Sequence, residues 1–193
     1  MYKLLLFVSA ITIFTFSSCG SGGNADPSDS VKGDSRAMLV TKIETEHKKL
    51  ATSKNYDPQA ALGALRLYTE FLSKYPNDSL TAEYLFVASD LATGTGNYQQ
   101  AAEFLETILA KHTNYPKYDD ALFAAALLYE TYLEDVNHGG DRAIQLYELI
   151  MAKYPGSYYA EQSALLKTYV GQPDSVFIND VMRKADSLQA IKK

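Results

Sequence analysis

The sequence predicts an all-α protein built as a stack of helical hairpins, on the strength of three observations. From Arg36 onward glycine and proline become sparse, and apolar residues recur at the i, i+3, i+4 spacing of amphipathic helices. No stretch sustains the alternation of apolar and polar residues that marks a half-buried strand. Tyrosine–proline pairs end at Pro76, Pro116 and Pro155, which are almost equally spaced along the chain. A fixed period of roughly 40 residues is typical of helical repeats.

Each of the three related segments before these prolines predicts one helix. A small alanine is followed four positions later by a large residue and three positions after that by another, so the large residues share one helix face. The alanine permits close approach of a neighbouring helix, and proline cannot continue a helix because it lacks the N–H donor. The segments are residues 64–76, 101–116 and 143–155.

Partner helices are expected between these segments, so that each period forms a hairpin. They cover residues 79–93, 118–134 and 158–169, and glycine- and asparagine-containing turns lie at 94–97 and 137–141. Residues 36–53 and 58–75 predict a further pair before the first proline. Residues 174–190 predict a last helix, whose Phe177, Val181 and Leu188 are expected to face inward. The prediction is therefore seven or eight helices.

The amino-terminal part of the chain has the layout of a secretory signal. Lys3 precedes an apolar run at residues 4–16, and small serines follow at 17 and 18. Thirteen helical residues extend about 20 Å, which is short of the roughly 30 Å needed to cross a bilayer. The predicted organisation is a signal peptide at 1–18, a flexible glycine- and serine-rich tether at 19–35, and a helical repeat domain at 36–193.

The segment Phe16-Ser17-Ser18-Cys19-Gly20 resembles the lipobox of bacterial lipoproteins. It departs from that pattern at Phe16, where the family prefers leucine. The resemblance implies that Cys19 is the lipid attachment site, is diacylated on its sulfur and becomes the new amino terminus. Gly20 replaces the aspartate of enterobacterial lipoproteins retained in the inner membrane, which implies the outer membrane. We expect the protein to face the periplasm, and the sequence leaves the surface-exposed face as the alternative. The alternative is an ordinary signal peptide followed by a chance cysteine.

The repeats resemble the tetratricopeptide repeat, whose inter-helix turn is similar to Gly96-Asn97-Tyr98-Gln99-Gln100-Ala101. The first helices lack the tryptophan of that family, and the period is longer than its usual length of roughly 34 residues. Residues 56–169 look like bacterial envelope proteins with such repeats. Two such families are the repeat lipoprotein of the outer-membrane β-barrel assembly machinery and the periplasmic coordinator associated with the Tol-Pal system. The resemblance implies a tetratricopeptide-like α-solenoid with a concave groove.

Composition and motif searches indicate a binding protein. The chain has 18 Lys and Arg against 23 Asp and Glu, a net charge of −5 that disfavours a nucleic-acid partner. None of His47, His112 and His138 has a second histidine at i+3 or i+4, and no phosphate-binding loop or nucleophile elbow is found. We therefore expect no catalytic residues, no metal, no cofactor and no small-molecule substrate.

The tetratricopeptide resemblance also implies which residues line the groove. The first helix of each hairpin lines the concave side in that family, which places Glu83, Phe86, Asp90, Thr93, Tyr129 and Tyr132 there. Aromatic rings beside carboxylates suit an extended peptide; the alternative is that each ring is a packing residue. The expected function is a lipid-anchored periplasmic scaffold for an envelope protein or peptide. The alternative is a chaperone-like binder of unfolded outer-membrane chains.

Four Asp-Ser-aliphatic triplets resemble the acceptor used for O-glycosylation of exported proteins in Bacteroidetes. They begin at Asp29, Asp78, Asp174 and Asp186. Serine and aspartate also precede helices as capping residues. Both interpretations remain open from the sequence, and capping is the one we favour.

Overall fold

The computed structural model describes residues 27–53, 55–136 and 138–191. The expected signal peptide and the lipid attachment site Cys19 lie outside the described residues. The described residues form helices joined by short turns, with no strand among them, which confirms the predicted fold class and the count of seven or eight helices. Its elements are α1 (Pro27–Thr52), α2 (Pro58–Lys74), α3 (Thr81–Gly94), α4 (Tyr98–Lys111), α5 (Tyr118–Tyr132), α6 (Gly139–Lys153), α7 (Tyr158–Leu166), the short 3-10 helix η1 (Lys167–Tyr169) and α8 (Asp174–Ile191).

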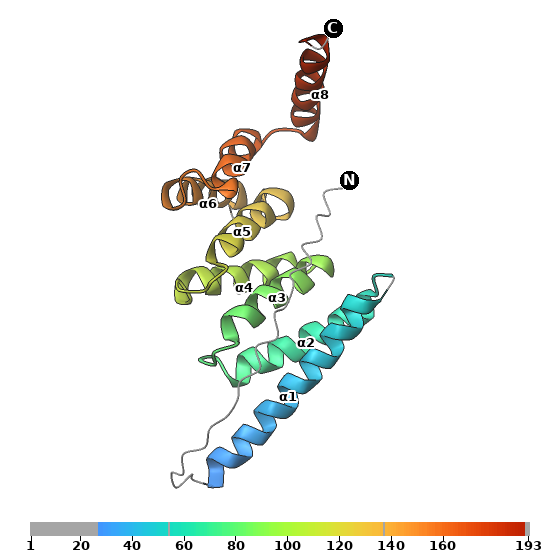
Figure 1. Cartoon of the computed structure of the whole chain (residues 1–193), viewed down its shortest axis with the longest axis vertical. Coiled ribbons are helices and arrows are strands. Elements are labelled where there is room, and N and C mark those ends of the chain that lie inside the picture. Colours follow the sequence, from blue (N-terminus) through green and yellow to red (C-terminus); the bar gives the residue numbers. More distant parts are fainter. Residues whose placement is uncertain (1–26, 54, 137, 192–193) are drawn as a thin grey trace.

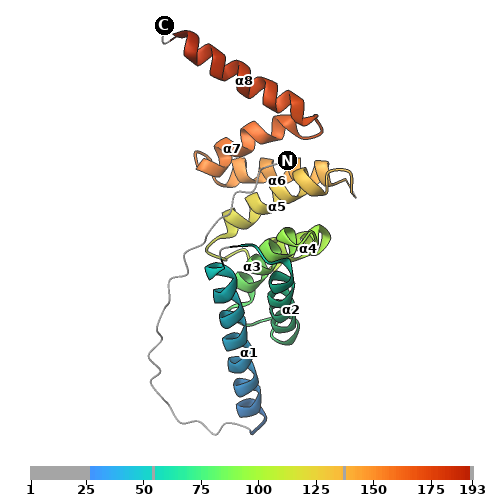
Figure 2. The same cartoon turned by 90° about the vertical axis from the view of Figure 1, so that its right-hand side faces the viewer.

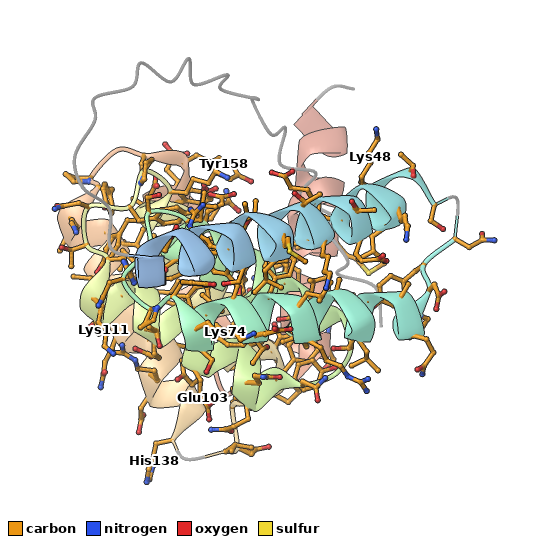
Figure 3. The ribbon with its side chains drawn as sticks, turned by 90° about the horizontal axis from the view of Figure 1, so that it is seen from below. Lys48, Lys74, Glu103, Lys111, His138 and Tyr158 are labelled. Carbon is orange, nitrogen blue, oxygen red and sulfur yellow. The ribbon has the colours of Figure 1, made fainter. Side chains whose placement is uncertain are left out.

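Each helix from α1 to α7 packs on the next one in the chain, so the hairpins form an elongated stack (Figure 1). The helices fall into two layers, because side-chain contacts also join alternate helices, such as α5 with α7 and α4 with α6. α1, α3, α5 and α7 form one layer and α2, α4 and α6 form the other. Seen along the stack, Glu103 of α4 and His138 lie on one side, and Lys48 of α1 and Tyr158 of α7 lie on the opposite side (Figure 3).

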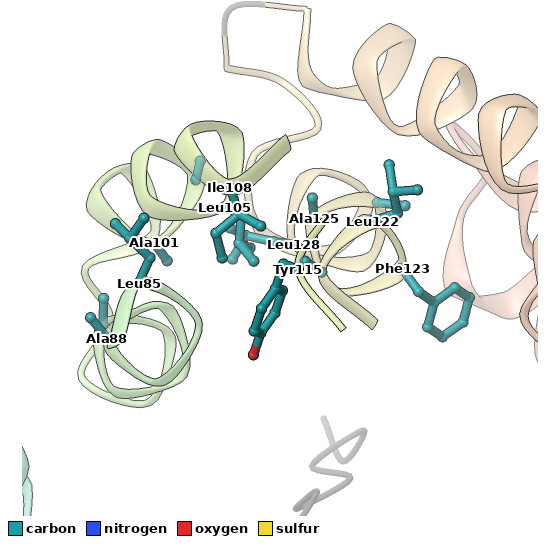
Figure 4. Close-up of a cluster of buried hydrophobic side chains, with 14 of the residues drawn as sticks. Leu85, Ala88, Ala101, Leu105, Ile108, Tyr115, Leu122, Phe123, Ala125 and Leu128 are labelled. Atoms are coloured by element: carbon teal, nitrogen blue, oxygen red, sulfur yellow. The ribbon is translucent and has the colours of Figure 1, made fainter. Parts of the chain in front are cut away.

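The core contains the alanines and the large residues that the repeated segments predict to be buried. Ala64, Ala101 and Ala143 are buried and let neighbouring helices come close. The large residues that follow them on the same face are buried in all three repeats: Tyr68, Leu105 and Tyr147, then Phe71, Ile108 and Ile150. Figure 4 shows Leu105 and Ile108 of α4 facing Leu128 of α5, whereas Leu122 lies on the other side of α5.

Helix α1 begins earlier than composition suggests. The structure places residues 27–35 in a helix, where the glycine and serine content predicts the second half of the tether. Pro27 stands at the helix start, where a missing N–H costs nothing. Once residues 36–52 are packed, each further residue adds one hydrogen bond without a new nucleus, so the helix extends toward its amino terminus.

Two contacts hold α1 against the turn between α2 and α3. The Arg36 guanidinium donates two hydrogen bonds to Asp78, at 2.5 and 2.7 Å, and Ser35 and Tyr75 pair their hydroxyls at 3.0 Å. Asp78 also accepts a hydrogen bond from the backbone N–H of Leu80 at 3.0 Å. The Asp-Ser-Leu triplet at this position therefore has a turn-forming role, as the capping interpretation predicts.

Replacing Asp78 with asparagine is expected to lower the free energy of unfolding at pH 7 by about 1–2 kcal/mol, because charge-assisted hydrogen bonds are lost. Arg36 holds the pKa of Asp78 below its ordinary value, and the Leu80 N–H adds to the shift. Stability from a lowered carboxyl pKa is present above about pH 4 and disappears as the pH falls below it. Urea titrations of both proteins should differ at pH 7, and the difference should shrink as the pH falls below about 4. A constant difference would contradict this assignment.

The last helix departs from the prediction. Val181 was expected to face inward, but 49% of its surface is exposed, and α8 extends away from the stack (Figure 2). Gly171, with a φ of 77°, and Pro173 separate η1 from α8 and redirect the chain. Phe177 does make an inward contact, since its ring meets Tyr169 edge to face at 5.1 Å. The side chain of Leu188 lies outside the described residues.

Candidate functional site

Glu83 on α3 is fixed by two groups from the segment that precedes α5. The hydroxyl of Tyr115 donates a hydrogen bond to Glu83 at 2.7 Å, and the ammonium of Lys117 pairs with its other oxygen at 3.0 Å. Burial and proximity to the Glu83 carboxylate together raise the pKa of Tyr115. Figure 4 shows the Tyr115 ring beside α5 with its hydroxyl pointing away from the α4 and α5 leucines. This contact joins the first layer across two successive hairpins.

Phe86 and Asp90 follow Glu83 on the same helix, at i+3 and i+7. Phe86 is half-buried against the core, with its ring centre 6.1 Å from that of Tyr115. Surrounding protein raises the pKa of Asp90 to about 6, and Lys117 partly offsets this while the charge of Glu83 adds to it. Asp90 is nevertheless exposed to solvent. Because water reaches this carboxylate, solvent screens its charge.

Tyr129 and Tyr132, expected in the same groove, contact the second layer instead. Burial and the carboxylate of Glu106 on α4 raise the pKa of Tyr129. Glu106 in turn accepts two hydrogen bonds from Arg142 on α6, both at 2.8 Å. Tyr132 stacks on Tyr98 at the start of α4, with ring centres 4.1 Å apart and planes 9° from parallel. The prediction of one continuous groove is therefore wrong for these two tyrosines.

The cause of this error is a one-residue offset in register. Shifting Asp90 along the chain by the spacing between Pro76 and Pro116 gives Glu130, and Tyr129 stands one position before it. One residue turns a side chain by about 100° around a helix. That rotation turns the Tyr129 side chain to the side of α5 that meets α4 and α6. Glu130, the true equivalent of Asp90, accepts a hydrogen bond from the hydroxyl of Tyr147.

The first layer continues past α5 as a row of aromatic and acidic side chains. Phe123 on α5 stacks on Tyr159 of α7, with ring centres 4.8 Å apart, and the Tyr159 hydroxyl donates a hydrogen bond to Asp120. Burial and the Asp120 carboxylate raise the pKa of Tyr159. Tyr158 meets Tyr159 edge to face and is largely exposed. We call the surface formed by Glu83, Phe86, Asp90, Tyr115, Lys117, Asp120 and Tyr158 the first-layer face.

Charge on α3, α5 and α7 differs from charge on the helices of the second layer. Helices α3, α5 and α7 contain acidic residues and no lysine or arginine, and Lys117 just before α5 is the nearest cation to Glu83 and Asp90. Their acidic residues are Glu83, Asp90, Asp119, Asp120, Glu130 and Glu161. Helices α2, α4 and α6 balance acidic and basic residues, as in the Glu106–Arg142 pair. The part of the first-layer face formed by α3, α5 and α7 is therefore more negative than the second layer.

Tyr115 and Lys117 were not identified as site residues from the sequence. Tyr115 was recognised only as part of a helix-ending pair, and Lys117 follows that pair without a motif. Both lie far from Glu83 along the chain, nearly one repeat later. The repeat period was the one sequence signal that could have identified these two residues. Because successive hairpins stack at that period, the turn before α5 lies beside the start of α3.

Other surface features of the described residues lie elsewhere. An open depression of about 230 Å³ is lined by Thr41, Thr45 and Leu67 between α1 and α2. Another of about 330 Å³ lies where Arg66 and Thr69 of α2 face Asn97. Both are shallow rather than enclosed, unlike the clefts that bury small ligands.

Two searches of the described residues returned nothing. They contain no group of three or more histidine, cysteine, aspartate or glutamate side chains placed to hold a metal ion. In the same part of the chain, no helix combines the length and the apolar character needed to cross a bilayer.

Known proteins were compared with the chain in three ways. Neither protein-family models, nor curated proteins, nor solved structures give a match.

Proposed function

We propose that this protein is a non-catalytic scaffold that binds a segment of an envelope protein through its first-layer face. The observation that carries the proposal is the arrangement around Glu83, where Tyr115 and Lys117 hold the carboxylate between two hairpins. Asp90 and Phe86 extend this arrangement along α3. A preorganised surface loses little side-chain entropy when a partner binds, which favours affinity.

The chemistry of the face favours a partner segment that carries lysine or arginine. Helices α3, α5 and α7 bring carboxylates without lysine or arginine, so a cationic side chain gains attraction along these three helices, with Lys117 as the basic group beside them. Phe86 and Tyr158 offer apolar area on which the aliphatic stem of such a side chain can lie. Aromatic anchors beside charged groups are the usual composition of binding hot spots.

Anchoring at the outer membrane is the second part of the proposal, and it rests on the sequence. The lipobox-like segment ending at Cys19 supports a lipid anchor facing the periplasm, and two or three acyl chains suffice for stable attachment. The tetratricopeptide resemblance supports an envelope role. Radiolabelled palmitate should be incorporated by the chain and lost on replacing Cys19 with serine.

The Asp90→Asn substitution is expected to change stability and binding in opposite directions. Because the folded-state pKa of Asp90 is about 6, above its ordinary value, folding loses stability as the pH rises from about 4 to 6. The asparagine variant lacks this loss, so at pH 7.5 it should unfold at higher urea than the parent. Its affinity for the partner should fall about tenfold, through the lost charge-assisted contact. Parent affinity should fall likewise between pH 7.5 and pH 5.

The partner for this test comes from affinity capture with the tagged, detergent-solubilised chain. Phe86→Ala and Asp90→Asn should lose the captured protein, and Leu149→Ala, which alters an exposed side chain on α6, should retain it. One or two proteins in fixed proportion support the scaffold. Recovery of many unfolded outer-membrane chains would favour the chaperone-like alternative. Unchanged capture by folded Phe86 and Asp90 variants would overturn the assignment of the face.

A further inference from the structure

Helix α8 carries an apolar stripe that faces away from the stack. Ile178, Val181 and Met182 are 52%, 49% and 61% exposed, and their i, i+3, i+4 spacing puts them on one side of the helix. The sequence continues this spacing with Ala185 and Leu188. In Figures 1 and 2 the helix projects beyond α7, and among the described elements it is absent from the closely packed helix pairs.

The opposite side of α8 is the one held by the stack. The hydroxyl of Tyr169 donates a hydrogen bond to Asp180 at 3.0 Å, and Arg183 pairs with the same carboxylate at 2.7 Å. Asp180 lies two residues from both Ile178 and Met182, which places it roughly opposite them around the helix. The contact with Tyr169 therefore fixes the start of α8 in an orientation that leaves the stripe outward.

Charge along α8 indicates what can cover the stripe. The first half of the helix contains Asp174 and Asp180 and no basic residue. The second half begins with Arg183 and Lys184 and contains one carboxylate, Asp186, and two lysines end the chain at 192 and 193. Two copies aligned in parallel would set like charges side by side. Two antiparallel copies set the acidic half of each beside the basic half of the other, and the apolar stripes face each other.

We propose that α8 is a self-association element, and that two copies of this protein pair through antiparallel contact of their α8 helices. An 18-residue helix is about 27 Å long, so the contact is smaller than a standard protein interface of some 800 Å² per partner. The pair is therefore weak in solution. The proposal uses no residue of the first-layer face and is independent of the proposed partner.

Sedimentation equilibrium of the full chain in detergent, followed to high micromolar concentration, measures the association. The parent should show a monomer–dimer equilibrium. The double variant Ile178→Asp, Met182→Asp should raise the dissociation constant at least about tenfold. Leu149→Asp places one aspartate on an exposed apolar position of α6 and should leave the dissociation constant unchanged. Circular dichroism establishes that the variants keep their helices. A parent that stays monomeric, or a double variant that dimerises like the parent, overturns the proposal.

Cysteine cross-linking tests the antiparallel geometry. In an antiparallel pair only positions near the middle of the contact meet their own copy, so Met182→Cys and Ala185→Cys should form disulfide-linked dimers. Ser175→Cys, near the start of α8, should not. Cys19 is present in every variant and in the unsubstituted chain, which supplies the background. Equal cross-linking at position 175 would indicate a parallel pair and contradict the proposal.

Discussion

Replacing Phe71 with alanine is expected to lower the free energy of unfolding by about 3–5 kcal/mol, the range for emptying a fully enclosed aromatic site. Phe71 is completely buried where α1, α2 and α3 meet. Its ring centre lies 4.7 Å from that of Tyr84 and 5.1 Å from that of Tyr75, and the Arg36 guanidinium lies over it at 5.8 Å. The cavity would loosen three helices together. Equilibrium urea denaturation followed by circular dichroism measures the loss.

A suitable control is Met38→Ala on α1, because that side chain is exposed and its truncation leaves no cavity. It should change the free energy of unfolding by less than about 0.5 kcal/mol. If Phe71→Ala also cost less than about 1 kcal/mol, well below the usual range for such a truncation, the close packing of α1 and α3 around this ring would be disproved.

Replacing Gly139 with alanine is expected to destabilise the protein by about 3 kcal/mol or more, because the new carbon collides with backbone. An added Cβ would lie 1.9 Å from the carbonyl oxygen of Leu133 and 2.6 Å from its carbonyl carbon. Backbone cannot rotate away as a side chain can, so the turn between α5 and α6 must move. Leu133 is itself buried, which carries the displacement into the core. The thermal midpoint should fall by several degrees.

The adjacent glycine gives a matched comparison. A Cβ on Gly140 would meet its nearest atom, Cγ of Glu134, at 3.4 Å, which is an ordinary contact. Alanine also favours helix there, so Gly140→Ala should change stability by less than about 1 kcal/mol. Equal effects of the two substitutions would show that the close approach of Gly139 to Leu133 does not constrain the fold.

Local periodicity predicted the helices and much of the core, because those features depend on residues three or four positions apart. Tyr68, Leu105 and Tyr147 could be identified as buried since each stands four residues after an alanine on the same face. The direction of α8 could not be predicted in this way. Its apolar spacing is that of a packed helix, whereas Gly171 and Pro173 set where the helix goes.

The candidate site was predicted only in part. Glu83, Phe86 and Asp90 lie on one helix, so their common face follows from spacing alone. The contacts that fix Glu83 come from Tyr115 and Lys117, which are distant in the sequence, and depend on how successive hairpins rotate about the stack axis. A one-residue error in the register between repeats assigned Tyr129 to the wrong side of α5. Spacing within a helix is therefore reliable, and register between helices needs the structure.

The packing of each helix on its neighbour in the chain also has a consequence for how the molecule opens. Contacts between elements close in sequence make folding fast. The free energy of unfolding is then approximately the sum of one contribution from each hairpin and one from each interface between neighbouring hairpins. Helices α3 to α6 have neighbours on both sides, whereas α1 and α8 have a neighbour on one side or none. Unfolding therefore begins as fraying from the two ends, and amide hydrogens should exchange with solvent there long before they exchange at the centre of the stack.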